Sequence, residues 1–243
     1  VIDICNAMSD VCIAIMRGII LVAPFGVFGL ICPVIASNGI DVLRPLLWLI
    51  VVAYVAMIVQ ILLVYSGIIK IFARMNPLKF LKGEMPVMGF AFASASSVGT
   101  LPINMECTEK MGISKEVTSF VLPLGATINM DGTAIMQVVA TVFIAGCAGY
   151  TVTPAQLVVV ALLALLASVG TPAAPGAGAV ILFTILSGAG FVNDSALLAY
   201  SLILAINRPI EMLVTSLNVV GDAVASICVA KSEGLLNEEK FNA

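Results

Sequence analysis

Long apolar runs dominate the sequence and constrain the fold more than any other feature. The longest, from Val42 to about Ala73, holds more than 30 residues, enough for a tilted helix across a bilayer. Of the 243 residues, 61% are hydrophobic and 10% are charged, whereas soluble domains carry about 25% charged residues. In hydrocarbon every backbone polar group must be paired, which a helix achieves within its own segment. The sequence therefore predicts an all-α polytopic membrane protein.

Composition also excludes several classes of protein. The net charge is only -3 and the basic residues are scattered, so no nucleic acid is expected as a partner. The absence of histidine removes the commonest metal ligand and general base. The cysteines lie far apart without a CxxC pair and are predicted to be core residues, not a disulfide framework or a zinc site. They are Cys5, Cys12, Cys32, Cys107, Cys147 and Cys228.

Basic residues predict which side of the membrane each end of a run faces. The first run, from Val11 to about Ala36, leads into a turn at residues 37–41. The long run ends at residues 70–77 and 79–84, which we expect to form one short basic loop. By the positive-inside rule this loop is cytoplasmic. The basic residues expected on that side are Arg17, Lys70, Arg74, Lys79, Lys82, Lys110, Lys115, Lys231 and Lys240.

Two apolar runs are broken by small residues and proline. Pro86 to Met105 is interrupted at residues 94–102, and Leu157 to Phe191 is interrupted at residues 168–178. Such breaks leave backbone groups unpaired in lipid, so each run is predicted to be a re-entrant hairpin buried in protein. Basic residues flank the first run at both ends, whereas the loops around the second lack them. The hairpins therefore enter from opposite faces, as inverted repeats of a secondary transporter do.

Asp131 is a carboxylate in the middle of an apolar segment, within the stretch from Leu124 to Thr133. An ionised carboxylate there costs a few kcal/mol or more, so it should face a partner, a cavity or an ion path. Gly125 and Gly132 would let the helix loosen and turn carbonyls toward the same point. Oxygen ligands of this kind suit a hard cation. An aspartate that only caps a broken helix is the alternative.

A polar stripe runs along the last apolar segment. Glu211, Thr215, Asn218 and Asp222 are spaced by four, three and four residues, which puts them on one helix face. The face must contact protein or water, and hydrogen bonding between helices is the structural alternative to a binding site. Arg208, three residues before Glu211, is expected to neutralise it or to reach the membrane surface.

Four motifs of the sequence closely resemble the glutamate transporter family, the dicarboxylate and amino acid to cation symporters. They are residues 96–102, 122–133, 168–178 and 218–222, and the similarity runs from about Val11 to Glu233. The resemblance implies an elevator-type transporter that forms a homotrimer, with a moving domain that holds two hairpins around substrate and sodium. It also implies four further spans before Val11, so we expect the chain to be a fragment that does not transport alone.

The resemblance divides the chain into three parts. Residues 1–77 are expected to hold two transmembrane helices, and residues 232–243 a loosely ordered cytoplasmic tail. Residues 78–231 are expected to form the transport core. Its parts are hairpin 1 (about 80–108), a broken helix (about 116–148), hairpin 2 (about 155–192) and a last helix (about 195–231).

The resemblance also implies a set of binding residues. Its substrate contacts are Ser97, Thr133, Ala174, Gly178, Glu211, Val214, Thr215 and Asn218. One sodium site would use Gly125, Asn129, Asn218 and Asp222; a second Thr127, Ser168, Val169 and Thr171; and a third Asn129 and Asp131. Glu211 stands where the family has a carboxylate that pairs with the substrate ammonium.

Two positions predict the substrate class. Family members that carry acidic substrates have an arginine at the position of Val214 or of Ala95. A second substrate carboxylate would enter this pocket unpaired, at a cost of several kcal/mol. We therefore expect sodium-coupled symport of a small neutral amino acid such as threonine, serine or alanine, with a proton as the alternative coupling ion.

The sequence leaves other functions as alternatives. The first alternative is a symporter of acidic amino acids or dicarboxylates, and a more distant one is an ion channel, whose pore the hairpins would plug. An enzyme is not expected, because Ser97 or Ser168 would lack a base. Membrane lipid is the expected surrounding, and the bacterial inner membrane the expected location.

Overall fold

The computed structural model describes residues 43–242, together with isolated positions before residue 43. The first expected span, residues 11–36, and the turn at residues 37–41 therefore lie outside the continuously described part of the chain. Within that part the secondary structure consists of helices and turns, with a single isolated β-bridge. The all-helical fold predicted from the sequence is confirmed there, and three of its helices are long and apolar enough to cross a membrane.

The first described helix runs without a break from Leu43 to Ala73. It begins as α2 (Leu43–Val59) and continues as the π-helical turns η2 (Gln60–Tyr65), the short α3 (Ser66–Ile68) and a second π segment, η3 (Ile69–Ala73). A π turn holds an extra residue and so changes the direction of the side chains that follow it. Many of its large apolar side chains are exposed, as a surface in contact with lipid requires.

The basic loop predicted after this helix is much shorter than expected. Only residues 74–76 connect η3 to α4 (Pro77–Ser94), so Lys79 and Lys82 lie on a helix. The Asn76 side chain accepts a hydrogen bond from the Leu78 N–H (2.9 Å), and Pro77 occupies the first helical position. A capping side chain followed by proline is a strong helix start, and it prevails over the charges that suggested a loop.

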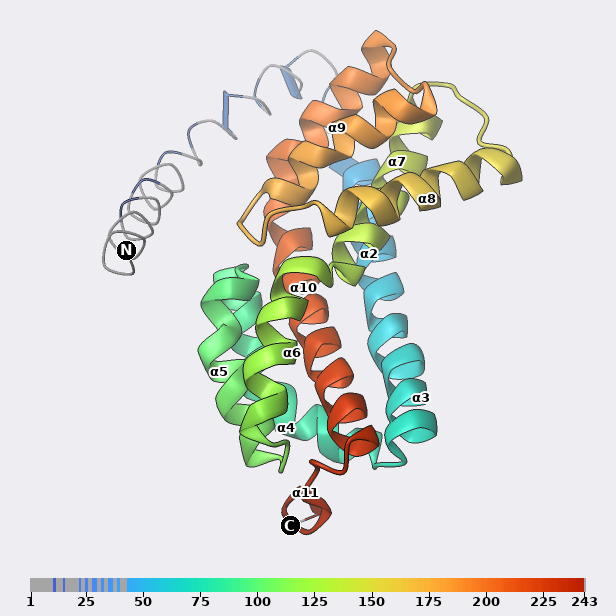
Figure 1. The fold of residues 1–243 in the computed structure, drawn as a ribbon. Helices are drawn as coiled ribbons and strands as arrows, with labels where there is room; N and C mark the ends of the chain where they lie inside the picture. The colour runs from blue at the N-terminus through green and yellow to red at the C-terminus, as the bar shows by residue number, and fades with distance from the viewer. Residues whose placement is uncertain are drawn as a thin grey trace. The chain divides into compact units, whose positions relative to one another are not determined.

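Both broken runs form pairs of short helices (Figure 1). In the first pair, only Ala95 and Ser96 separate α4 from α5 (Ser97–Lys110). Ala95 adopts a left-handed conformation (φ 50°), and the Ser96 side chain accepts a hydrogen bond from the Gly99 N–H (3.1 Å) to begin α5. In the second pair, residues 170–176 link α8 (Pro154–Val169) to α9 (Ala177–Ala189).

The segment around Asp131 is a broken helix, and α10 packs against both of its halves. It consists of α6 (Lys115–Ile128) and α7 (Asp131–Cys147), interrupted at residues 129 and 130. The last long helix, α10 (Asp194–Ser232), also packs against α4, α5, α9 and η3. Every residue from Val214 to Val224 is buried, so this part of α10 is surrounded by protein. It is the helix on which the two pairs and the broken helix converge (Figure 1).

The expectation of a loosely ordered tail is wrong. After α10 the chain forms α11 (Glu238–Asn242) and lies against the turn between α5 and α6. Leu236 forms the β-bridge with Ile113, and the Lys240 ammonium donates a hydrogen bond to the Glu109 carbonyl (2.6 Å). The tail carries apolar side chains between its charges, and burying them is favourable. Phe241 is buried accordingly.

Candidate binding site

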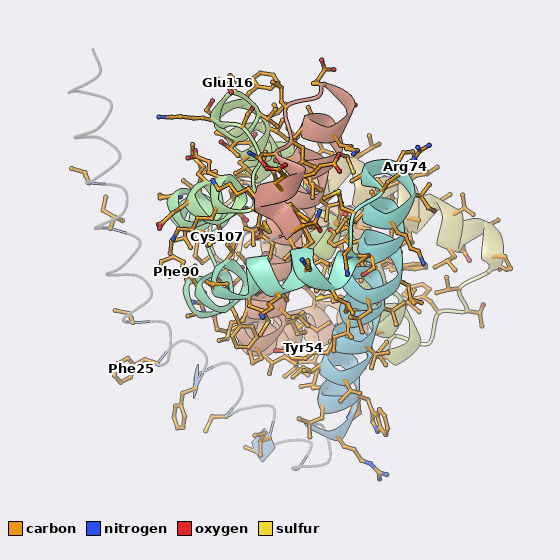
Figure 2. All side chains as sticks on the ribbon, turned by 90° about the horizontal axis from the view of Figure 1, so that it is seen from below. Phe25, Tyr54, Arg74, Phe90, Cys107 and Glu116 are labelled. Atoms are coloured by element: carbon orange, nitrogen blue, oxygen red, sulfur yellow. The ribbon has the colours of Figure 1, made fainter. Side chains whose placement is uncertain are left out.

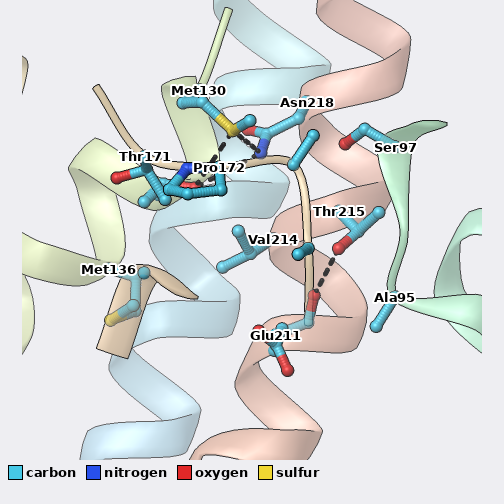
Figure 3. A pocket seen from close by; sticks show the side chains of 14 residues that line it. Ala95, Ser97, Met130, Met136, Thr171, Pro172, Glu211, Val214, Thr215 and Asn218 are labelled. Atoms are coloured by element: carbon cyan, nitrogen blue, oxygen red, sulfur yellow. Dashed lines mark hydrogen bonds between the residues drawn. The ribbon is translucent and has the colours of Figure 1, made fainter. Parts of the chain in front are cut away.

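A small cavity lies where the first pair, the second pair, α7 and α10 meet (Figure 3). Its volume is about 30 Å³, which is room for one or two water molecules. An amino acid therefore needs movement of a wall before it can enter. The lining residues are Ala95, Ser97, Met130, Thr133, Met136, Thr171, Pro172, Ala173, Ala174, Gly178, Glu211, Val214, Thr215 and Asn218.

All eight residues expected to contact substrate line this one cavity. They come from four separate segments: Ser97 from the start of α5, Thr133 from α7, residues 174 and 178 from the second pair, and the rest from α10. Met130, Met136 and Pro172 also line the cavity and are not among the predicted site residues. Met130 could have been included, because it lies between the two polar residues of the Asn129–Asp131 motif.

The Asn218 amide ties α10 to the start of α7. Its Oδ1 accepts a hydrogen bond from the Gly132 N–H (2.8 Å), and its Nδ2 donates toward the Thr133 hydroxyl (3.3 Å) and the Met130 sulphur (3.3 Å). A Cβ at Gly132 would lie 2.7 Å from the Val214 carbonyl oxygen, so only glycine permits this approach. The polar side of the cavity is therefore fixed by direct contacts between two helices.

Glu211 is the only ionisable side chain among the lining residues. One of its oxygens accepts a hydrogen bond from the Gly176 N–H, which holds the link of the second pair over the cavity. The other lies 3.5 Å from Arg208 Nη1. The Arg208 guanidinium also donates to the Ser94 carbonyl at the tip of the first pair (3.4 Å). Arg208 thus neutralises Glu211 from the edge of the cavity. This is the first of the two roles expected for Arg208 from the sequence.

Four predicted cation ligands form a second cluster beside the cavity. The Asn129 amide donates to Asp222 Oδ1 (2.9 Å) and to the Asn218 carbonyl (3.1 Å). A Cβ at Gly125 would lie only 2.4 Å from Asp222 Oδ1, so the α6 backbone also reaches this point. Asp222 is 1% exposed, and the ion pairs found in the described residues do not include it. A buried carboxylate beside backbone carbonyls suits a hard cation.

Asp131 lies on the other side of the break and binds the first described helix. Its Oδ2 accepts a hydrogen bond from the Tyr65 hydroxyl (2.8 Å) and a long one from the Gln60 amide (3.5 Å). The helix start at Met130 has no side-chain capping bond, so Asp131 does not act as the cap proposed in the alternative interpretation. Gln60 and Tyr65 are not among the predicted site residues, although polar residues inside the longest apolar run are a signal.

Of the four ligands predicted for another sodium site, only Ser168 and Thr171 share a hydrogen bond in the described structure. The Thr127 hydroxyl donates to the Leu124 carbonyl of its own helix (2.7 Å). Ser168 and Thr171 are buried at the end of α8, where the Thr171 N–H donates to the Ser168 carbonyl (3.0 Å), while Val169 is exposed. Their joint site stays a prediction.

Comparison with known proteins identifies a family and relatives that cover most of this chain. Residues 1–232 match the sodium:dicarboxylate symporter family. The chain is 36% identical to excitatory amino acid transporter 2 of Homo sapiens, over 91% of this chain and 38% of that protein. It is also 36% identical to the proton/sodium-glutamate symport protein of Bacillus caldotenax, over 90% of this chain and 51% of that protein. The chain thus spans between about two fifths and half the length of these relatives.

Proposed function

The chain belongs to the sodium:dicarboxylate symporter family, and from this premise we propose that it supplies the substrate and cation sites of a cation-coupled amino acid symporter. Members of this family are transporters and not enzymes. The observation that carries the proposal is the position of Asn218, whose side chain lines the cavity while its carbonyl belongs to the Asp222 cluster. Substrate and cation would therefore bind on two sides of one residue.

Coupling follows from this shared residue. A cation held by Asp222 and the neighbouring carbonyls would fix Asn129 and Asn218, and so order the polar side of the cavity before substrate binds. Each ligand then favours the same arrangement of α7 and α10, which is thermodynamic linkage. Sodium is the proposed coupling ion, and a proton is the alternative, in keeping with the name of the bacterial relative.

Entry of the substrate would require the second pair to open. The link at residues 170–176 covers the cavity and is held by Glu211 through the Gly176 N–H. A substrate ammonium group would compete for the same carboxylate, whereas Ser97, Thr133 and the Asn218 amide offer neutral hydrogen bonds to a substrate carboxylate. Exchange of the Gly176 contact for a substrate contact would link binding to movement of the link.

The substrate class has two candidates, each supported by a different observation. The names of the relatives, transporters of excitatory amino acids and of glutamate, favour an acidic substrate over the neutral one predicted from the sequence. The cavity supports the neutral candidate, because Glu211 is the only ionisable group among its described lining residues, and Ala95 and Val214 are apolar. An acidic substrate would need Arg208 to leave Glu211 and turn toward the cavity.

Uptake by the full-length protein in liposomes tests both candidates. We would measure labelled threonine and labelled aspartate, each with and without an inward sodium gradient. Sodium-driven threonine uptake that aspartate does not inhibit would support the neutral candidate. Preferred aspartate uptake would reject it, and loss of that uptake in Arg208→Gln would identify the counter-ion. Uptake independent of both sodium and pH gradients would contradict coupled symport. The homotrimer and the bacterial inner membrane stay predictions.

A further inference from the structure

Glu84 on α4 is a carboxylate without a partner in the protein interior. Its exposure is 0%, and neither of its oxygens accepts a hydrogen bond from a described residue. The sequence predicts a short basic loop at this position, but α4 begins seven residues earlier and turns Glu84 inward. One and two helical turns further along, Val87 and Ala91 pack with Val219 of α10, so the surroundings are apolar.

The groups around Glu84 offer no positive charge. Against α4 pack α10, α5 and α3. The Ser216 hydroxyl donates to the Met88 carbonyl (2.9 Å) and Val219 packs against Val87. Asp222, one helical turn further along α10, therefore lies on the side of Glu84, and no hydrogen bond joins the two carboxylates. From α5 the titratable neighbour is the Cys107 thiol, labelled in Figure 2, and α3 contributes no ionisable side chain. Lys82 on the same helix is exposed, and the ion pairs of the described residues do not include Glu84.

An ionised carboxylate in such a place is unfavourable for two reasons. Its charge loses hydration without gaining hydrogen bonds, and it faces a like charge on Asp222. A neutral carboxylic acid avoids both costs. The equilibrium between neutral and ionised Glu84 depends on Asp222. A cation bound there would cancel the repulsion between the two carboxylates and so stabilise the ionised form of Glu84.

We propose that Glu84 is a proton-binding site, separate from the cavity and from the Asp222 cluster, which gives up its proton to water when a cation binds beside Asp222. The O–H bond of the acid breaks, the carboxylate keeps the electron pair, and the bound cation offsets the new charge. Linkage is reciprocal, so a protonated Glu84 weakens cation binding. The release step rests on the cation site of the proposed function; the proton on Glu84 does not.

Infrared difference spectroscopy of the full-length protein tests the proton directly. In sodium-free buffer at neutral pH, the wild type should give the carbonyl band of a protonated carboxylic acid, and Glu84→Gln should lack that component. Glu106→Gln is the matched control, because Glu106 is an exposed carboxylate of α5 paired with Lys110 (2.6 Å). Persistence of the complete band in Glu84→Gln would overturn the proposal. If Glu84→Gln does not fold, Glu84→Met, an apolar residue of similar length, tests the same band.

Sodium titration tests the release of the proton. Addition of sodium should weaken the Glu84 band in the wild type, and the apparent sodium affinity at alkaline pH should be about fivefold or more lower in Glu84→Gln, a usual size of coupling between sites. Equal affinities in the two proteins across the pH range would overturn the linkage. A Glu84 band together with no sodium response anywhere would instead reject the proposed cation site, so the two failures are distinguishable.

Discussion

Gly125 shows how a single missing side chain shapes the cation cluster. A methyl group there would stand 2.4 Å from one Asp222 oxygen, closer than any real contact, so Gly125→Ala must displace the carboxylate. We predict that the apparent sodium affinity falls by about tenfold, which corresponds to about 1.4 kcal/mol. The dependence of uptake, or of thermal stability, on sodium concentration measures this change.

The matched control for this prediction is Gly89→Ala. Gly89 is also in the interior of a helix, α4, and a Cβ there meets nothing within 4 Å. In both variants alanine raises the intrinsic helix propensity by about 1 kcal/mol, so propensity alone cannot separate them. Equal sodium affinity in the two variants would show that Gly125 does not determine the cluster.

Individual residues also show the limits of sequence-based inference at the site. Spacing along one helix predicted the face that holds Glu211, Thr215 and Asn218, because that pattern is local and periodic. The contact between Tyr65 and Asp131 joins positions 66 residues apart, and helix periodicity carries no information on such a pair. The burial of Glu84 was not predicted for a related reason. Whether a position near the start of a helix is buried depends on three-dimensional packing and not on the density of charged residues around it in the sequence.

At the scale of elements, the link between α8 and α9 acts as the cover of the cavity. Gly176 has φ +86°, a left-handed conformation that favours glycine, and its N–H holds Glu211. In Gly176→Ala the side chain has free space, but the conformation costs about 1–2 kcal/mol. We predict a KM for substrate that is about fivefold higher, because the strained link no longer holds its closed position.

Gly190→Ala provides the comparison for that variant. Gly190 also has a positive φ (+78°) and open space around its Cβ, but it ends α9 away from the cavity. The two substitutions should lower thermal stability by similar amounts, and only Gly176→Ala should change KM in uptake assays. A similar KM change in both variants would mean that general destabilisation, and not the link, is responsible.

Element boundaries were predictable where the chain gives local signals. Thr153 precedes Pro154 at the start of α8 and forms a reciprocal cap with Gln156, and Asn76 precedes Pro77 in the same way. The cap at Thr153 lies where the second hairpin was predicted to begin. The cap at Asn76 lies among basic residues, which led to the prediction of a loop there. The π turns η2 and η3 had no sequence signal, because the few polar residues of the long apolar run are too sparse to define a helical phase from which a shift could be read.

At the scale of the whole molecule, the charge distribution and the two similar broken runs predicted more of the order of the elements than any single motif did. Small-residue breaks recur in two runs, and each run forms a pair of short helices next to a longer one. The order of these parts could be derived because each element is long and locally marked. The docking of the tail onto the turn between α5 and α6 could not, since it depends on contacts such as that of Lys240 with Glu109, formed across 131 positions of sequence.

The inverted arrangement of the two pairs leads to a prediction about sidedness. If both pairs are re-entrant, the start of α4 and the start of α6 face the cytoplasm, while the loop before α8 and the end of α9 face outward. In a full-length background without native cysteines, Leu78→Cys and Glu116→Cys should react with a membrane-impermeant thiol reagent only from the inside. Thr151→Cys and Val192→Cys should react only from the outside, and all four positions are exposed.

The pairing of these labels separates a hairpin from a span. Leu78 and Glu116 bracket the first pair, so labelling from opposite sides would mean that α4 and α5 cross the membrane. The same reasoning applies to Thr151 and Val192 around the second pair. Leu78 and Thr151 must differ in sidedness, because the broken helix α6–α7 lies between them and is long enough to cross once. If all four cysteines reacted from one side, the broken helix would not span the membrane, and Asp131 would not lie within the hydrocarbon layer.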